Sequence, residues 1–169
     1  DFALAQVQNW YGSGNDSAAF IVDFLNGNSY AWGYLFNDSI AASQMLNDIA
    51  NQDANLSINA SGFLNDIIYL SDSGLGGQPN YWGTWSATNV GNWYMNAGIS
   101  HQVKAGELFG ASYTDFAPAL RPKAPKNNSA LGLRRSDRIS FDLYPNPAHN
   151  FIVVNGLRQD AYFKISNSQ

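Results

Sequence analysis

The chain contains no cysteine, and charged residues make up only 13% of its 169 residues. The missing cysteines exclude a disulfide framework, a cysteine-ligated zinc site and a thiol redox motif. No apolar run reaches the roughly 20 residues of a membrane-spanning helix, so no transmembrane segment is predicted. With 45% hydrophobic residues, a chain of this length can bury one core and carry a small appendage.

Residues suited to catalysis are also scarce. The only histidines are His101 and His149, and neither has the spacing of a metal ligand or of a Ser-His-Asp arrangement. Carboxylates that could be paired for glycoside hydrolysis are Asp66, Asp72, Glu107 and Asp115. Any acidic domain offers such pairs. We therefore predict no catalytic residue, no metal and no cofactor, and a carbohydrate-active hydrolase is only the third alternative.

Charge is unevenly distributed along the chain. Residues 1–120 hold ten acids against the single base Lys104, whereas residues 121–138 hold six bases against Asp137. The basic segment also contains two prolines and has little periodicity, which is typical of a solvated tether. This pattern predicts a flexible basic linker at residues 119–138. The acidity of the part before it argues against a nucleic-acid partner.

The first 118 residues begin with a predicted hairpin. Apolar residues alternate over 18–24 and again over 30–36, and Asn26-Gly27 between them is a strong two-residue turn signal. With a loop of only those two residues, Phe20 would lie opposite Gly33, so a large side chain would face a residue that has no side chain. A loop longer by one residue would exchange the faces of the strand, so the register depends on the loop length.

One helix is predicted at residues 40–50, with Ser39 or Asp38 as its N-cap. The residues at its i, i+3, i+4 and i+7 positions form a buried stripe, which we expect across one face of the hairpin: Ala42, Met45, Leu46 and Ile49. Further strands are predicted at 56–60, 63–70, 81–85, 93–95 and 107–113, with a glycine-rich loop at 74–79. Two strands, a helix and then more strands indicate a small β-rich α+β domain.

Nineteen of the 24 aromatic residues precede residue 120. Five of them lie in or beside the glycine-rich loop and are the predicted ligand-binding residues: Tyr81, Trp82, Trp85, Trp93 and Tyr94. If they are exposed, they would suit a flat apolar ligand or a carbohydrate, with Asp23, Asp66 and Asp72 as hydrogen-bond acceptors. If they are buried, they pack the core. The sequence leaves both interpretations open.

Several short sequence motifs of this region occur in an order that is found in one family of domains. They are Ser43-Gln44-Met45-Leu46, Gly62-Phe63-Leu64 with Ile67, Tyr81-Trp82, Trp93 with Gly98, and Gly106-Glu107 before Ser112-Tyr113. In this order the region resembles the transcobalamin C-terminal-like domains, small β-rich modules of secreted and surface proteins. The resemblance implies a corrinoid- or tetrapyrrole-binding surface protein as the alternative function. No position matches a ligand signature, so no residue role is carried over.

Near the end of the sequence, residues 141–150 read Phe-Asp-Leu-Tyr-Pro-Asn-Pro-Ala-His-Asn. Pro145 and Pro147 fix their φ angles and remove two backbone donors, so this stretch is stiff, extended and unsuited to a central strand. Alternating strands follow at 151–155 and 161–165. The stretch resembles the start of the type A C-terminal sorting domain carried by type IX secretion cargo of Bacteroidetes. The resemblance implies that the secretion signal comprises Tyr144, Pro145, Asn146, Pro147 and Ala148.

This second resemblance implies a domain organisation and a cellular location. It predicts a cargo domain at 1–118, the linker, and an incomplete β-sandwich sorting domain at 139–169. It also predicts localisation outside the cell or on the outer surface of a Gram-negative bacterium after removal of a signal peptide. The implied partners are the outer-membrane translocon and its shuttle protein, and the predicted function of the cargo is that of a non-catalytic binding or adhesion module.

Two tripeptides, Asp16-Ser17-Ala18 and Asp38-Ser39-Ile40, resemble the O-glycosylation acceptor pattern of the same bacteria. Ser17 and Ser39 are therefore predicted glycosylation sites. For Ser39 the alternative is the helix N-cap named above.

Overall fold

The computed structural model describes residues 4, 7, 9–24, 26–125, 142–144 and 153–155. The chain divides into two compact units, Asp1–Leu131 and Gly132–Gln169. In the second unit, strand β12 (Asp142–Tyr144) pairs antiparallel with β13 (Val153–Asn155). The strand predicted at 151–155 is thus found at its last three residues. Pro145 to Ala148 and the strand predicted at 161–165 lie outside the described residues.

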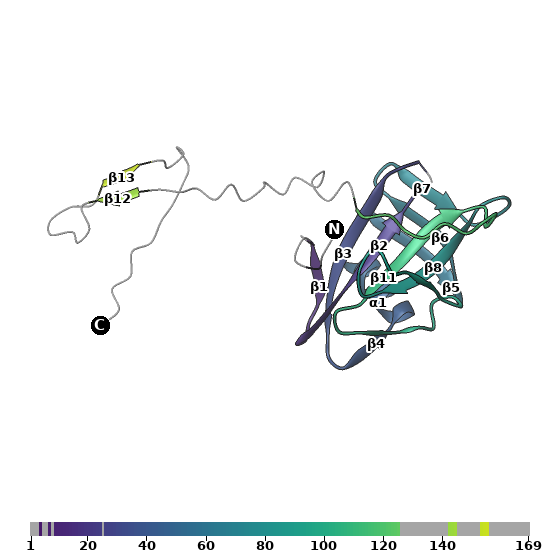
Figure 1. Ribbon diagram of the computed structural model, residues 1–169, viewed down its shortest axis with the longest axis horizontal. Helices are drawn as coiled ribbons and strands as arrows, with labels where there is room; N and C mark the ends of the chain where they lie inside the picture. The colour runs from purple at the N-terminus through teal and green to yellow at the C-terminus, as the bar shows by residue number, and fades with distance from the viewer. Residues whose placement is uncertain are drawn as a thin grey trace. The chain divides into compact units, whose positions relative to one another are not determined.

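The first unit is built on a six-stranded mixed sheet (Figure 1). Its strands, in spatial order, are β1 (Trp10–Gly12), β3 (Ser29–Phe36), β2 (Asp16–Asp23), β11 (Leu108–Thr114), β8 (Tyr81–Ala87) and β9 (Tyr94–Met95). The last long strand, β11, enters the sheet parallel to β2 and antiparallel to β8. With one helix against many strands, the predicted β-rich α+β class is confirmed.

The β2–β3 hairpin differs from its prediction by one residue. Phe20 lies opposite Trp32 and Val22 opposite Tyr30, so the prediction that Phe20 faces Gly33 is wrong. The turn is closed by Phe24 N–H donating to Asn28 O and Gly27 N–H donating to Phe24 O, which makes the loop longer than Asn26-Gly27 alone. Gly27 takes a φ of 90°, a conformation that glycine adopts without strain. This register gathers the large side chains of both strands on one face.

Helix α1 (Ala42–Gln52) buries the four predicted stripe residues completely, in the same core as Phe20 and Trp32. It begins two residues later than predicted, because β4 (Ser39–Ala41) pairs with β10 (Gln102–Lys104). The predicted cap at Ser39 or Asp38 is therefore wrong. Backbone carbonyls replace it, since Ala42 N–H donates to His101 O and Ser43 N–H donates to Ile99 O.

A second, three-stranded sheet covers the same core: β5 (Leu56–Ser61), β6 (Phe63–Tyr69) and β7 (Asp72–Leu75). The first two strands and the turn at Gly62 follow the prediction. The loop predicted at 74–79 is wrong in its first residues, because Gly74 and Leu75 belong to β7. Side chains of the main sheet bind the backbone of β7, since Trp82 Nε1 donates to Gly74 O (2.9 Å) and the Tyr113 hydroxyl donates to Leu75 O (2.6 Å).

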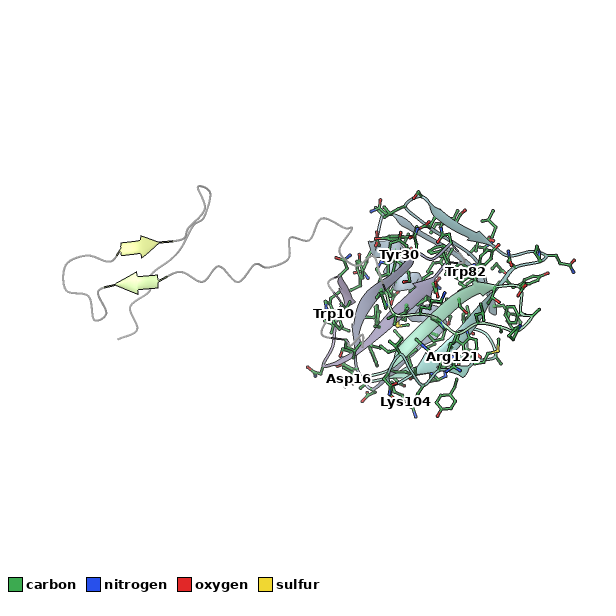
Figure 2. The ribbon with its side chains drawn as sticks, turned by 45° about the horizontal axis from the view of Figure 1, so that its top comes forward. Trp10, Asp16, Tyr30, Trp82, Lys104 and Arg121 are labelled. Carbon is green, nitrogen blue, oxygen red and sulfur yellow. The ribbon has the colours of Figure 1, made fainter. Side chains whose placement is uncertain are left out.

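Three successive inward side chains of β3 each donate a hydrogen bond to a carboxylate of the covering layer. Tyr30 bonds to Asp72 (2.6 Å), Trp32 bonds to Asp53 (2.8 Å), and Tyr34 bonds to Asp48 of the helix. Residues two apart on a strand share a face, so the three bonds form a ladder across the core. Burial, and then the hydrogen bond and charge of Asp48, raise the pKa of Tyr34 to about 12. Tyr30 and Trp82 are two of the side chains that tie the sheets together (Figure 2).

The opposite face of the main sheet carries a second apolar cluster, which includes Ile21, Trp85, Trp93 and Leu108. Residues 119–125, here called the strap, are bonded to this face. Lys123 N–H donates to an Asp23 carboxylate oxygen (3.0 Å), and the Ser29 hydroxyl donates to Ala124 O (3.1 Å).

Pro122 in the strap is buried and lies directly over Gly110, where a Cβ would come within 2.7 Å of the proline ring. The Ser112 hydroxyl donates to Leu120 O at the other end of the strap. A flexible linker beginning at 119 is therefore wrong, because residues 119–125 are part of the domain. Residues 126–138 of the predicted linker lie outside the described residues.

Candidate ligand-binding pocket

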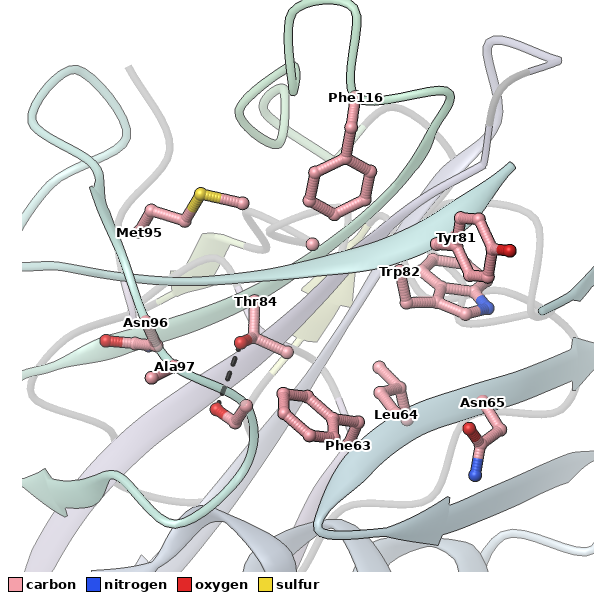
Figure 3. A pocket seen from close by; sticks show the side chains of 12 residues that line it. Phe63, Leu64, Asn65, Tyr81, Trp82, Thr84, Met95, Asn96, Ala97 and Phe116 are labelled. Atoms are coloured by element: carbon pink, nitrogen blue, oxygen red, sulfur yellow. Dashed lines mark hydrogen bonds between the residues drawn. The ribbon is translucent and has the colours of Figure 1, made fainter. Parts of the chain in front are cut away.

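A pocket of about 250 Å³ opens between β6 and β8 (Figure 3). One wall comes from the start of β6, with Phe63, Leu64 and Asn65, and the opposite wall comes from β8. The lining is completed by Met95 at the end of β9, by Asn96 to Gly98 after it, and by Phe116, which follows β11. The β8 residues in the lining are Tyr81, Trp82, Gly83 and Thr84.

The lining is apolar and carries no charged side chain. Ten large hydrophobic residues are exposed in the described part of the chain, and four of them line this one pocket: Phe63, Tyr81, Met95 and Phe116. Phe63 is the most exposed of the four, at 68%. Exposed apolar residues that gather around a hollow mark a binding surface, whereas single ones scattered over a domain do not.

Backbone hydrogen bonds hold the far end of the pocket in place. Asn96 N–H donates to Thr84 O (2.7 Å), and the Thr84 hydroxyl donates to Gly98 O (3.0 Å). Ile99 N–H then donates to Gly62 O (3.2 Å), at the turn before β6. The segment between Asn96 and Ile99 therefore bridges the two sheets, and it fixes the distance between the pocket walls.

The five predicted ligand-binding residues do not form one surface. Tyr81 and Trp82 line the pocket, but the Trp82 indole is buried and directed at Gly74. Trp85 and Trp93 are buried on the opposite face of the sheet. Trp82 and Trp85 are three residues apart on one strand, so their side chains point to opposite faces. Tyr94 is 73% exposed and lies outside the lining.

Of the four exposed hydrophobic residues that line the pocket, three were not predicted: Phe63, Met95 and Phe116. In sequence, Phe63 is indistinguishable from a core residue of a half-buried strand. Met95 and Phe116 stand at the ends of strands, where the alternation that signals a buried face has already stopped. Only the packing of the two sheets brings the three residues together.

The predicted acceptor carboxylates are all engaged outside the pocket. Asp72 accepts from Tyr30, Asn28 and Asn26, the last at 2.6 Å. Asp66 accepts from the Asn59 amide and from Gly76 N–H. An Asp23 carboxylate oxygen accepts from Lys123 N–H of the strap. A carbohydrate in the pocket would thus meet no carboxylate acceptor.

Asp72 also makes the stability of the domain depend on pH. Burial acts to raise its pKa, but hydrogen bonds from Tyr30, Asn28 and Asn26 outweigh burial and leave the pKa below its ordinary value of 3.8. A carboxyl group whose pKa is lower in the folded state than in the unfolded state stabilises the fold above its ordinary pKa. This contribution is lost as the pH falls through the lowered value.

We therefore expect the difference in unfolding free energy between the wild type and Asp72→Asn to be largest near neutral pH and to shrink below about pH 4. Urea unfolding at a series of pH values from 7 to 2 measures this difference. A difference that stays constant over the whole series would show that the ionised carboxylate does not stabilise the fold.

The side chains of His101 and Glu107 also have structural partners. His101 pairs with Glu107, which also accepts from Lys104 N–H, and the imidazole stacks on Phe109. Within the described residues, no group of three or more histidine, aspartate or glutamate side chains could hold a metal ion. Over the same residues, no helix is long and apolar enough to cross a membrane. His149 lies outside the described part of the chain.

The two predicted glycosylation sites differ in accessibility. Ser39 is exposed and follows Asp38, whose φ of 61° marks a tight turn. Ser17 is half-buried in β2, opposite Leu35 of β3. Ser39 thus offers the more accessible hydroxyl.

Comparison with known proteins yields no relative. No family model, no curated protein and no solved structure matches the chain.

Proposed function

We propose that the chain is a secreted or cell-surface protein whose N-terminal unit is a non-catalytic binding module, with the pocket between β6 and β8 as its ligand site. The observation that carries the proposal is the gathering of four exposed hydrophobic residues around an uncharged hollow. Binding there removes both the lining and the ligand from water, which favours an apolar ligand. The ligand class that fits is a neutral, flat, apolar group.

The size of the pocket limits the ligand further. A volume of about 250 Å³ accommodates one ring and leaves little room beyond it. Phe63, Tyr81 and Phe116 offer ring faces, and Met95 offers a flexible, polarisable side chain that adapts to the shape of the ligand. A sugar ring is the less favoured ligand because the lining contains no carboxylate acceptor.

Removing one exposed ring should weaken binding of a small aromatic probe. With N-acetylphenylalaninamide as probe, we expect Tyr81→Ala and Phe116→Ala each to weaken binding about tenfold, the loss of one ring contact. Titration of the ¹⁵N-labelled protein, followed by amide chemical shifts of the lining residues, measures the affinity. Tyr94→Ala is the matched control, because Tyr94 is exposed but lies outside the lining. Equal binding by all three variants would contradict the proposed site.

We also propose export by the type IX secretion system, on the basis of the motif from Tyr144 to Ala148. The stiff, donor-poor stretch would present an extended segment to the translocon or its shuttle protein, and the strands behind it could add to a partner's sheet. O-glycosylation at Ser39 and Ser17 is part of the same proposal.

Replacing Pro145 and Pro147 together with alanine should leave the protein in the periplasm, because the fixed extended conformation is lost. Immunoblots of the periplasm, the outer membrane and the medium of the native host measure the distribution. Pro125→Ala, at the end of the strap, is the control and should be exported as the wild type is. Normal secretion of the double variant would contradict the proposal.

A further inference from the structure

Strand β8 has one edge that is only partly paired. Along its inner edge it pairs with β11 over all seven residues. Along its outer edge it pairs with β9 only at Trp85 and Ser86, and Asn96 N–H reaches Thr84 O. Beyond Asn96 the chain turns away from this edge toward Gly62. The outer edge of β8 is thus left open from Gly83 to Tyr81.

The open edge presents backbone hydrogen-bonding groups. Thr84 O points outward, because Asn96 bonds to it there, and residues two apart on a strand direct their backbone groups to the same side. The N–H and C=O of Trp82 therefore also point outward. By the same alternation, the pairing of Trp82 with Tyr113 of β11 uses neither group, and among the described residues no loop backbone is bonded to them. Groups of this kind are obligatory donors and acceptors, and they pair with an added strand when one is available.

The pocket lies along this same edge. Phe116 lies near Gly83, on the face of the sheet opposite to that of the Trp82 side chain, and Leu64 and Phe63 of β6 line the pocket from the other side (Figure 3). The Trp82 side chain is held away from the opening by its bond to Gly74 O and by edge contact with Phe24. An unpaired strand edge beside an apolar pocket is the arrangement by which sheets bind extended peptides.

We propose that the ligand of this site is an extended polypeptide that pairs with β8 at Trp82 and places one large, neutral, apolar side chain in the pocket. This inference rests on the proposed binding function and names its ligand class. The open edge spans Tyr81 to Gly83, so it accommodates about three residues, roughly 10 Å of strand. Main-chain hydrogen bonds would supply orientation, and the pocket would select the side chain.

The test compares a ring probe with a strand probe on the ¹⁵N-labelled full chain. The ring probe is N-acetylphenylalaninamide, and the strand probe is an acetylated and amidated pentapeptide of four threonines around a central phenylalanine. Variants of the pentapeptide carry one N-methyl group at each position in turn. Along the open edge only Trp82 directs its C=O outward, so one N–H of the bound peptide pairs there, and methylation should weaken binding about tenfold at one position and little at the other four. The Trp82 amide should exchange more slowly with solvent when the peptide is bound.

Protein variants locate the binding. Phe63→Ala should weaken binding of the pentapeptide, whereas Leu75→Ala, which removes an exposed apolar side chain outside the lining, should leave binding unchanged. A larger loss in Phe63→Ala than in Leu75→Ala places the peptide in the pocket. Equal loss, or none in either, would overturn that placement.

The remaining outcomes separate this inference from the function on which it rests. If the ring probe binds and every N-methylated peptide binds as well as the parent, the site takes a ring only, and strand pairing is wrong while the proposed function stands. If neither probe shifts the lining residues and the protein sediments as a monomer, both are wrong. If the protein dimerises and its Trp82 amide is protected only in the dimer, a second copy occupies the edge, and the peptide proposal is overturned.

Discussion

Replacing Asp72 with alanine is expected to lower the free energy of unfolding by about 3 kcal/mol, a large part of the stability of a domain of this size. The Asp72 carboxylate is buried and accepts hydrogen bonds from Tyr30, Asn28 and Asn26. Alanine would leave these donors unpaired where the second sheet meets the main sheet. Urea unfolding at neutral pH measures the loss.

The same substitution at Asp66 is the matched control. Asp66 also accepts two hydrogen bonds, but they lie at the exposed surface, where water can replace them. The expected loss for Asp66→Ala is therefore below about 1 kcal/mol. If Asp72→Ala costs no more than its control, Asp72 does not hold the two sheets together.

Gly74→Ala is the second substitution with a large expected effect. A Cβ at this position would lie 2.3 Å from Cζ2 and 2.9 Å from Cε2 of the Trp82 indole. The indole cannot easily move away from the added Cβ, because it is buried, contacts Phe24 edge-on and packs beside Tyr113. The indole must therefore shift and lose its hydrogen bond to Gly74 O. We expect a loss of about 2 kcal/mol in the free energy of unfolding, again measured in urea.

Gly91→Ala serves as its control. A Cβ at Gly91 would approach only the Asn89 side-chain oxygen, at 3.3 Å, and the backbone there needs no positive φ. Its expected effect is within about 0.5 kcal/mol. An equal effect of the two glycine substitutions would contradict the close contact at Gly74. The double variant Asp72→Ala/Gly74→Ala should lose less free energy of unfolding than the sum of the two single losses. The reason is that both substitutions weaken the same contact between β7 and the main sheet.

Together these contacts show why the pocket is where it is. The second sheet pairs with no strand of the six-stranded sheet, and the two are joined by side chains that reach the backbone or a carboxylate of β7. The space between β6 and β8 is therefore not filled by a strand. What remains is a hollow with aromatic walls, on which the proposed binding function rests, beside an unpaired strand edge, on which the peptide inference rests.

Elements with a long, regular pattern could be predicted from the sequence. The α1 stripe, from Ala42 to Ile49, is found fully buried, and the strands predicted around residues 18–24, 30–36 and 107–113 are present. The short strands β1, β4, β7, β10 and β12 were missed, because three or four residues carry too little alternation to be recognised. The hairpin register was wrong by one residue, since the Asn26-Gly27 signal does not reveal that the loop is longer than two residues.

By itself, the sequence determined the α+β class, the helix face that enters the core and the strands with clear alternation, because these depend on neighbours a few residues apart. It also carries the Tyr-Pro-Asn-Pro motif on which the export proposal rests. Tertiary structure alone decided that the Trp82 and Trp85 rings are both buried, that the strap belongs to the domain, and that Phe63, Met95 and Phe116 share a pocket. These residues meet only because two sheets pack together, and the free energy of that packing comes from contacts between distant parts of the chain, which no local pattern records.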